Sequence, residues 1–168
     1  MTKTPSTSPL GPPLLGALLR MPVDVIRTRM LAALHEQGFA DLIPAHMIVL
    51  RYPGPDGLRP VEIAAQTGMT KQALNYLLGQ LETYGYLERV EDADDQRSKR
   101  VRMTERGYAA GRVMRGAVSE VEAEFAALYG SDELESLRSV LARLNTVLES
   151  DSRHRDECAR MQAASERR

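Results

Sequence analysis

The feature that most constrains this chain is a stripe of leucines that follows a glycine turn. The leucines recur at i, i+3, i+4 and i+7, the spacing of one face of a helix, at Leu74, Leu77, Leu78 and Leu81. Before them, the apolar-periodic segment 61–66 leads to Gly68, which can adopt the positive φ that ends one helix and turns the chain into the next. Thr70 stands where a helix N-cap belongs. This arrangement predicts a helix-turn-helix, whose second helix can lie in a DNA major groove.

The residues after this pattern predict a β-hairpin. Residues 87–90 have strand character, and a polar loop follows at 91–99. Residues 100–103 then alternate basic and apolar side chains, which is the period of a strand with one buried face. A helix-turn-helix followed by a hairpin is a winged helix. We therefore predict a mainly α fold with a small β-hairpin wing, flanked by N- and C-terminal dimerisation helices.

Three segments in this order resemble the MarR-type winged-helix transcription regulators, namely 68–73 (Gly-Met-Thr-Lys-Gln-Ala), 95–99 (Asp-Gln-Arg-Ser-Lys) and 103–107 (Met-Thr-Glu-Arg-Gly). The resemblance covers roughly residues 14 to 149. Its most specific part is the wing signature, Asp-x-Arg-Ser-Lys before a strand and a Thr-x-x-Gly helix start. In that family the wing arginine enters the minor groove and a nearby aspartate holds it, which implies these roles for Arg97 and Asp95. A guanidinium matches the negative potential of a narrow minor groove.

The candidate DNA contacts lie at the start of the predicted recognition helix and on the hairpin. They are Thr70, Lys71, Gln72, Asn75, Tyr76, Arg97, Lys99 and Arg100, with Asp95 orienting Arg97. Glutamine and asparagine can hydrogen-bond adenine in two places, and lysine suits phosphate or guanine. Tyr76 suits either a thymine methyl group or a phosphate. The alternative is that the helix face is only solvated, and that Asp92, Asp94 and Asp95 pair with the hairpin cations at the surface.

The chain divides by composition into five parts. Residues 1–13 form a disordered arm rich in Thr, Ser and Pro, 14–37 an N-terminal dimerisation helix, 42–104 the winged helix, 105–149 the C-terminal dimerisation helices, and 150–168 a charged, frayed tail. Pro22 predicts a kink or a restart in the first helix. The segment 44–50 is apolar nearly all round and is expected in the core.

A second leucine stripe requires a partner surface. Its members repeat every three or four residues, at Leu134, Leu137, Leu141, Leu144 and Leu148. The small winged helix already uses its own core, so we expect a homodimer in which residues 14–34 and 117–149 intertwine. Two-fold symmetry would then require a pseudo-palindromic site in double-stranded DNA. The alternative is a monomer with these helices folded back.

The overall charge and hydropathy limit the class of protein. The formal net charge is −1, so the chain is not coated with positive charge. This does not exclude DNA binding, because affinity depends on where cations cluster. No apolar run approaches the roughly 18 residues of a membrane span, and the N-terminus lacks a signal layout. We expect a cytoplasmic protein without a membrane partner.

The sequence predicts neither catalysis nor a metal site. The three histidines, His35, His46 and His154, lie in separate segments without ligand spacing. The single cysteine, Cys158, excludes an internal disulfide and a cysteine-based zinc cluster. No glycine-rich phosphate loop or nucleophile elbow is present. We expect no enzyme activity and no cofactor.

Regulation by a small molecule follows only from the family resemblance. Members commonly repress genes, and release DNA when an aromatic or phenolic ligand enters between the dimer helices and the winged helices. The resemblance implies the same here, with candidate pocket residues Ile26, Met30, Met47, Tyr52 and Tyr108. A different class of function is a winged helix that serves as a protein-interaction module without specific DNA readout. Such a module would present an exposed apolar patch.

Overall fold

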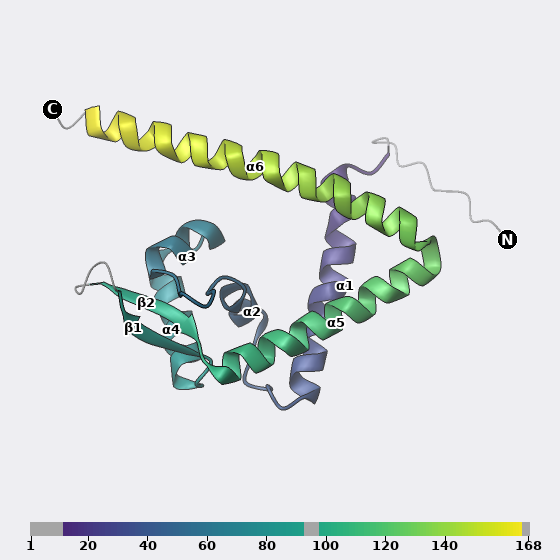
Figure 1. Cartoon of the computed structure of the whole chain (residues 1–168), viewed down its shortest axis with the longest axis horizontal. Helices are drawn as coiled ribbons and strands as arrows, with labels where there is room; N and C mark the ends of the chain where they lie inside the picture. Colours follow the sequence, from purple (N-terminus) through teal and green to yellow (C-terminus); the bar gives the residue numbers. More distant parts are fainter. Residues whose placement is uncertain (1–11, 93–97, 166–168) are drawn as a thin grey trace. The chain divides into compact units, whose positions relative to one another are not determined.

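The structure is a computed structural model that describes residues 12–92 and 98–165, with side chains as far as residue 148. Within these residues the elements are α1 (Leu15–Glu36), α2 (Pro44–Leu50), α3 (Pro60–Thr67), α4 (Lys71–Thr83), β1 (Leu87–Glu91), β2 (Lys99–Met103), α5 (Glu105–Tyr129) and α6 (Ser131–Ser165) (Figure 1). The predicted fold class is confirmed. The chain forms two compact units, one reaching Val121 and the other beginning at Glu122, and each is described by itself.

The helix-turn-helix consists of α3 and α4. Gly68 ends α3 in the left-handed conformation with φ of 67°, as the sequence predicts. Thr70 is the N-cap of α4, and its Oγ1 accepts a hydrogen bond from the backbone N–H of Ala73 at 3.2 Å. All four leucines of the predicted stripe on α4 are buried. This burial fixes the rotation of α4 and decides which face remains outside.

The core lies between α2, α3, α4 and the hairpin. The α4 leucines join Leu34 of α1, Ile63 of α3 and Val101 of β2 in one apolar cluster. Pro44 is the first residue of α2, as predicted. The prediction that α2 is core all round is wrong at one position, because Ile48 is 38% exposed while Met47, Val49 and Leu50 are buried.

The wing is an antiparallel pair of strands that lies beside α4 (Figure 1). Its register places Glu88 opposite Arg102 and Glu91 opposite Lys99. These opposite charges form exposed cross-strand ion pairs, at 2.7 Å and 3.5 Å respectively. The loop before α3 adds a further bridge, in which Leu58 and Val101 exchange two backbone hydrogen bonds.

Two expectations about the flanking helices need correction. The helix α1 continues through Pro22 without a restart, since a proline removes one backbone donor while the neighbouring turns keep theirs. The helix α6 continues to Ser165, so the predicted frayed tail beyond Ser150 is helical over most of its length.

The start of α5 is packed closely against the residues that follow α4. Thr104 caps α5, as predicted, by accepting from the N–H of Gly107 at 3.2 Å, and its own hydroxyl donates to the carbonyl of Gly85 at 2.6 Å. Close packing explains Gly107, because a Cβ there would collide with the carbonyl oxygen of Tyr86. It does not explain Gly116, where a Cβ would meet nothing within 4 Å.

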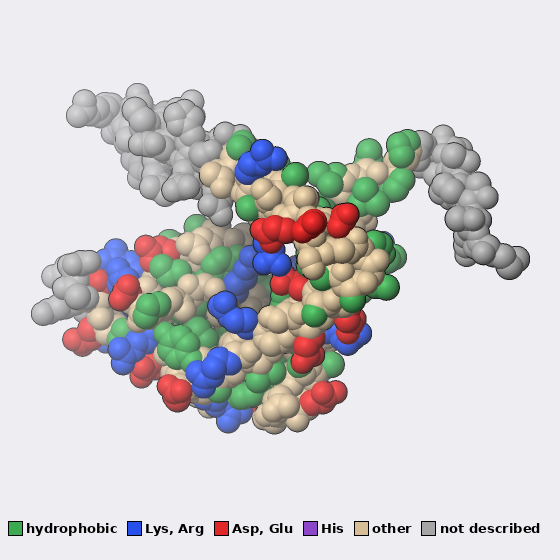
Figure 2. All heavy atoms as spheres, turned by 45° about the vertical axis from the view of Figure 1, so that its right-hand side comes forward, with side chains coloured by type: hydrophobic (Ala, Val, Ile, Leu, Met, Phe, Trp, Pro, Cys, Tyr) green, Lys and Arg blue, Asp and Glu red, His purple; other side chains and the backbone are tan. Residues whose placement is uncertain are grey.

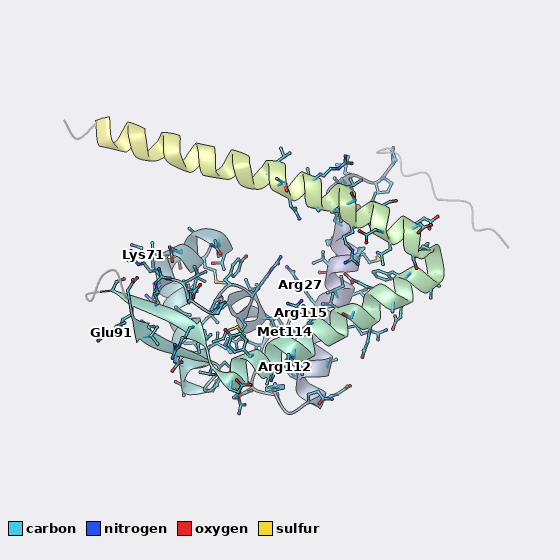
Figure 3. The ribbon with its side chains drawn as sticks, in the orientation of Figure 1. Arg27, Lys71, Glu91, Arg112, Met114 and Arg115 are labelled. Atoms are coloured by element: carbon cyan, nitrogen blue, oxygen red, sulfur yellow. The ribbon has the colours of Figure 1, made fainter. Side chains whose placement is uncertain are left out.

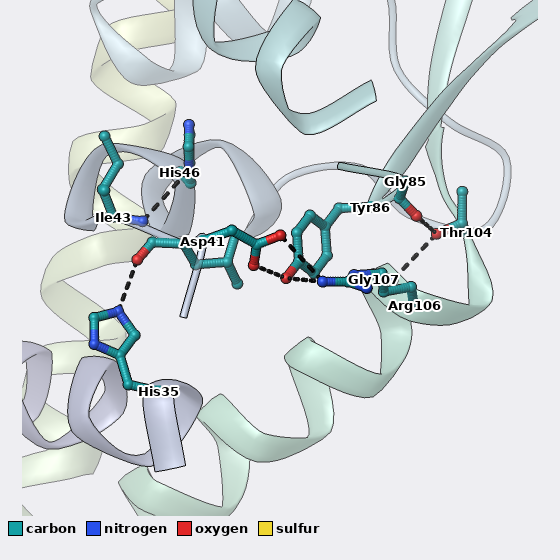
Figure 4. A network of polar contacts seen from close by, with 10 residues as sticks. His35, Asp41, Ile43, His46, Gly85, Tyr86, Thr104, Arg106 and Gly107 are labelled. Carbon is teal, nitrogen blue, oxygen red and sulfur yellow. Dashed lines mark hydrogen bonds and ion pairs between the residues drawn. The ribbon is translucent and has the colours of Figure 1, made fainter. Parts of the chain in front are cut away.

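A polar network ties three segments of the N-terminal unit together (Figure 4). The hydroxyl of Tyr86 donates to Asp41 Oδ1, and Arg106 Nη2 donates both to Asp41 Oδ2 and to the Tyr86 oxygen, each at 3.1 Å. The Arg106 guanidinium also lies 4.7 Å from the centre of the Tyr86 ring. Burial, followed by the hydrogen bond to Asp41, raises the pKa of Tyr86 above its ordinary value, and Arg106 only partly opposes this.

This network predicts a pH dependence of stability. Because the pKa of Tyr86 is higher in the folded chain than in the unfolded chain, the folded chain binds the tyrosine proton more tightly. The contribution is complete below pH about 10, the ordinary pKa of tyrosine, and is lost as pH rises through the folded value. Urea unfolding between pH 9 and 11.5 should show a steeper loss of stability for the native chain than for Tyr86→Phe. Equal slopes for the two proteins would contradict the assignment.

Candidate nucleic-acid interface

The exposed face of α4 carries the side chains that the sequence predicts to contact DNA. Lys71, Gln72, Asn75 and Tyr76 are all exposed, opposite the buried leucines. Lys71 projects from the first turn of the helix (Figure 3). Residues at this end of a recognition helix are the ones that usually meet base edges. Gln72 and Asn75 are therefore accessible, which a reading role requires.

The predicted wing contacts are only partly described. Arg97, Asp95 and Asp94 lie outside the described residues, so their roles stay predictions. Lys99 is half-exposed and its Nζ lies 3.5 Å from Glu91 Oε1. Because an exposed pair of this kind contributes only about 0–1 kcal/mol, Lys99 can exchange its partner for a phosphate at little cost.

Asp92 does not fit the alternative in which the hairpin acids pair with cations at the surface. Its side chain is 0% exposed. Its Oδ2 accepts from Arg59 Nε at 2.6 Å and lies 3.2 Å from Arg100 Nε. The carboxylate thus joins the end of β1 to the residue before α3 and to the second residue of β2. Asp92 is a wing-anchoring residue.

Arg100 makes further contacts beside its ion pair with Asp92. Besides Asp92, its Nη1 donates to the carbonyl of Gly57 at 3.1 Å and lies 3.4 Å from that of Asp56. Gly57 has φ of 69°, and a Cβ there would lie 2.8 Å from the carbonyl oxygen of Val101. The loop 56–58 therefore needs glycine to approach the strand this closely. The predicted contact of Arg100 with DNA is untested, and its guanidinium already has these protein partners.

The five candidate pocket residues do not share one environment. Met47 is a core residue, and Met30 and Tyr52 are half-buried against the same core. Ile26 is half-buried on α1, and Tyr108 is 36% exposed on α5. The structure therefore brings three of the five to one cluster, where they are packed as core side chains.

Charges on the winged helix are mixed rather than of one sign. On the face drawn in Figure 2, lysine and arginine side chains lie interspersed with aspartate and glutamate. Among the described residues, no group of three His, Cys, Asp or Glu side chains is placed to hold a metal ion. Membrane-spanning helices are likewise absent from the described part of the chain.

Comparisons with known proteins agree with this geometry. Residues 40–98 match the sequence model of the MarR family. The apo crystal structure of MarR from E. coli matches with a TM-score of 0.65 at 21% identity, covering 79% of this chain and 98% of that one. The Mycobacterium tuberculosis MarR family protein RV2887, in complex with salicylic acid, matches at 28% identity and a TM-score of 0.59, covering 79% and 97%. Regulator Tm0710 from Thermotoga maritima matches at 21% identity and 0.58, covering 80% and 93%.

The matched segment contains α2, α3, α4, β1 and the residues between the two strands, and so includes all the candidate DNA contacts except Lys99 and Arg100. Residues 40–98 therefore match the MarR family, and solved MarR family proteins share the winged-helix fold of this chain.

The Asp92 anchor can be tested by stability. Asp92→Asn keeps the shape but leaves two arginines without their carboxylate, and we expect a loss of about 1–3 kcal/mol in the free energy of unfolding. The matched control is Glu88→Gln, which breaks the exposed pair with Arg102 on the same hairpin and should cost about 0.5 kcal/mol or less. Urea denaturation measures both. Equal losses in the two variants would show that the Asp92 cluster is not an anchor.

Proposed function

We propose that the chain is a sequence-specific transcriptional repressor that binds a pseudo-palindromic operator as a homodimer and is released by a small aromatic ligand. It acts in the cytoplasm, and no catalytic step is part of the proposal. The observation that carries it is the division of α4 into two faces: a buried leucine stripe and an exposed set of polar side chains at the helix start. That set matches the donors and acceptors that a major groove presents.

The wing supplies the second point of contact in this proposal. Arg97 enters the minor groove with Asp95 holding it, and Lys99 binds phosphate. The Asp92 anchor supports these roles, because it fixes the end of the hairpin to which residues 93–97 are joined. Thr70, Lys71, Gln72, Asn75, Tyr76 and Arg100 complete the set of proposed DNA contacts.

The dimer is supported by apolar side chains that the single chain leaves exposed. On α6 they are Leu137, Val140, Leu144, Val147 and Leu148, and at the N-terminal side Leu14, Leu15, Leu18 and Met21. Exposed apolar side chains in such numbers mark surfaces that a partner covers. A second copy of the chain is the partner that also gives two recognition helices, as a palindromic operator requires.

The effector part of the proposal is supported by the salicylic acid complex of RV2887. In this chain the ligand site would draw on Ile26, Met30, Met47, Tyr52 and Tyr108. Release requires that the ligand bind more tightly to a dimer whose recognition helices are wrongly spaced for DNA.

DNA binding can be tested on the promoter beside the chain's own gene, by gel shift at two salt concentrations. Arg97→Ala should weaken operator binding about tenfold or more, since a minor-groove cation is lost. Lys99→Ala should weaken binding to all sequences alike and lower the salt slope by about 1. Glu91→Gln is the control of opposite sign, because it removes the partner of Lys99 and one negative charge and should tighten binding.

If Arg97→Ala and Lys99→Ala both left operator affinity unchanged, the wing would not touch DNA. If the native chain bound no promoter duplex but captured a protein through the exposed α4 face, the interaction-module alternative would replace the proposal.

The dimer can be tested by sedimentation at low micromolar concentration, where the native chain should run at twice its monomer mass of 18.7 kDa. Leu137→Glu places a charge on the exposed stripe and should raise the dimer dissociation constant about tenfold or more. Ser139→Glu, on another face of α6, is the matched control and should not. A native chain that sediments only at 18.7 kDa would contradict the dimer.

A further inference from the structure

A buried histidine is linked to the exposed face of the recognition helix. His46 of α2 is 1% exposed. Its Nδ1 lies 3.4 Å from the backbone nitrogen of Ile43 (Figure 4), and its Nε2 lies 3.0 Å from Gln80 Oε1. Gln80 Nε2 in turn lies 3.2 Å from the hydroxyl oxygen of Tyr76, one turn earlier on α4. The chain of contacts therefore runs from the core to a side chain that is 67% exposed.

The chemistry of each group fixes the direction of every hydrogen bond in this chain. A backbone N–H can only donate, so Nδ1 of His46 accepts from Ile43 and carries no proton. The ring proton is then on Nε2, which donates to Gln80 Oε1. This sets the orientation of the Gln80 amide and makes its Nε2 the donor to the Tyr76 oxygen. The Tyr76 O–H then points away from Gln80, and no acceptor for it is seen among the residues that the structure describes.

Packing holds the chain of contacts in this arrangement. The His46 ring meets the Tyr84 ring edge-on, with centroids 6.0 Å apart. Met47, beside it on α2, and Leu77 and Leu81 on α4 are all buried in the same core. A buried imidazole that lost its partner on Gln80 would leave a polar group unsatisfied, which is costly. The amide therefore cannot be reversed without breaking the bond to Nε2.

We propose that His46 and Gln80 are positioning residues that fix the Tyr76 hydroxyl as a hydrogen-bond donor to a phosphate oxygen of DNA. The inference rests on the proposed function and deepens it, because the sequence left Tyr76 open between a thymine methyl group and a phosphate. A phenol held as a donor needs a partner that accepts. Phosphate oxygens only accept and recur at every nucleotide, and they receive half or more of protein–DNA hydrogen bonds.

The position of Tyr76 along α4 favours the DNA backbone as well. It is the sixth residue of the helix, counted from Lys71, and its hydroxyl is directed toward Gln80, still further from the helix start. Base edges are normally met by the first residues of a recognition helix. Lys71 and Gln72 occupy those places, which favours a flanking phosphate as the partner of Tyr76.

A double-mutant cycle on full-length protein tests this positioning role. The variants are Tyr76→Phe, Gln80→Glu and the double variant, each titrated with the operator duplex and with an unrelated duplex. Tyr76→Phe removes only the hydroxyl and should weaken binding about tenfold on both duplexes, the cost of one hydrogen bond to a charged group. In the Gln80→Glu background the same change should cost less than twofold. The introduced carboxylate accepts from the Tyr76 hydroxyl and turns it inward, so DNA has already lost the donor.

The cycle separates this effect from others. Repulsion between the new carboxylate and DNA is common to the two proteins that carry Gln80→Glu, so it cancels in the coupling. If Gln80 had a merely structural role, Tyr76→Phe would still cost about tenfold beside Gln80→Glu, which would overturn the inference. A tenfold loss confined to the operator duplex would show base reading and would overturn the phosphate assignment.

An independent measurement needs no DNA. The nitrogen-15 shifts of His46 in the native chain should show a bare Nδ1 and a protonated Nε2. A proton on Nδ1 would reverse the whole chain of hydrogen bonds and overturn the inference, whatever the binding data show. If the native chain bound no duplex, the proposed function would fail and the phosphate contact with it, while the tautomer result would stand apart.

Discussion

The geometry of the winged helix depends on the buried ion pairs that the carboxylate of Asp92 forms with two arginines. It is completely buried, and arginines from both sides of it, Arg59 before α3 and Arg100 on β2, supply the charge that makes its burial tolerable. An ion taken out of water costs several kcal/mol, and that cost is offset only when the partners are well placed. The two arginines and the carboxylate therefore keep the hairpin, the loop 56–58 and the start of α3 in one arrangement.

The recognition helix shows how one element serves packing and recognition together. Its leucines give the apolar area that fixes α4 in the core, while the residues between them stay in solvent. Gln80 lies at the boundary between these two faces, half-buried, and contacts both His46 below and Tyr76 above. The polar contact crosses from core to surface within a single helical turn. The position of His46 in the core can thus determine the orientation of the Tyr76 hydroxyl at the surface.

Features encoded by neighbouring residues were predictable from the sequence, and features that join distant segments were not. The leucine stripe, the Thr70 cap and the Gly68 turn each depend on residues within one or two helical turns, so their spacing is visible in the sequence. The burial of Asp92 depends on Arg59, which is 33 positions away, and no local sequence pattern predicts that pairing. The same holds for His46 and Gln80, separated by 34 positions. Pro22 does not restart the helix, since a helix tolerates the loss of one donor when the turns around it persist.

The junction between the wing and α5 contains a single residue, Thr104, because β2 ends at Met103 and α5 begins at Glu105. That residue is bound on both sides: its N–H donates to the carbonyl of Tyr86, and its hydroxyl donates to that of Gly85. A one-residue junction that is hydrogen-bonded on both sides has little backbone freedom. A rotation of α5 about its long axis must therefore move β2 with it, so the helix and the hairpin are mechanically coupled.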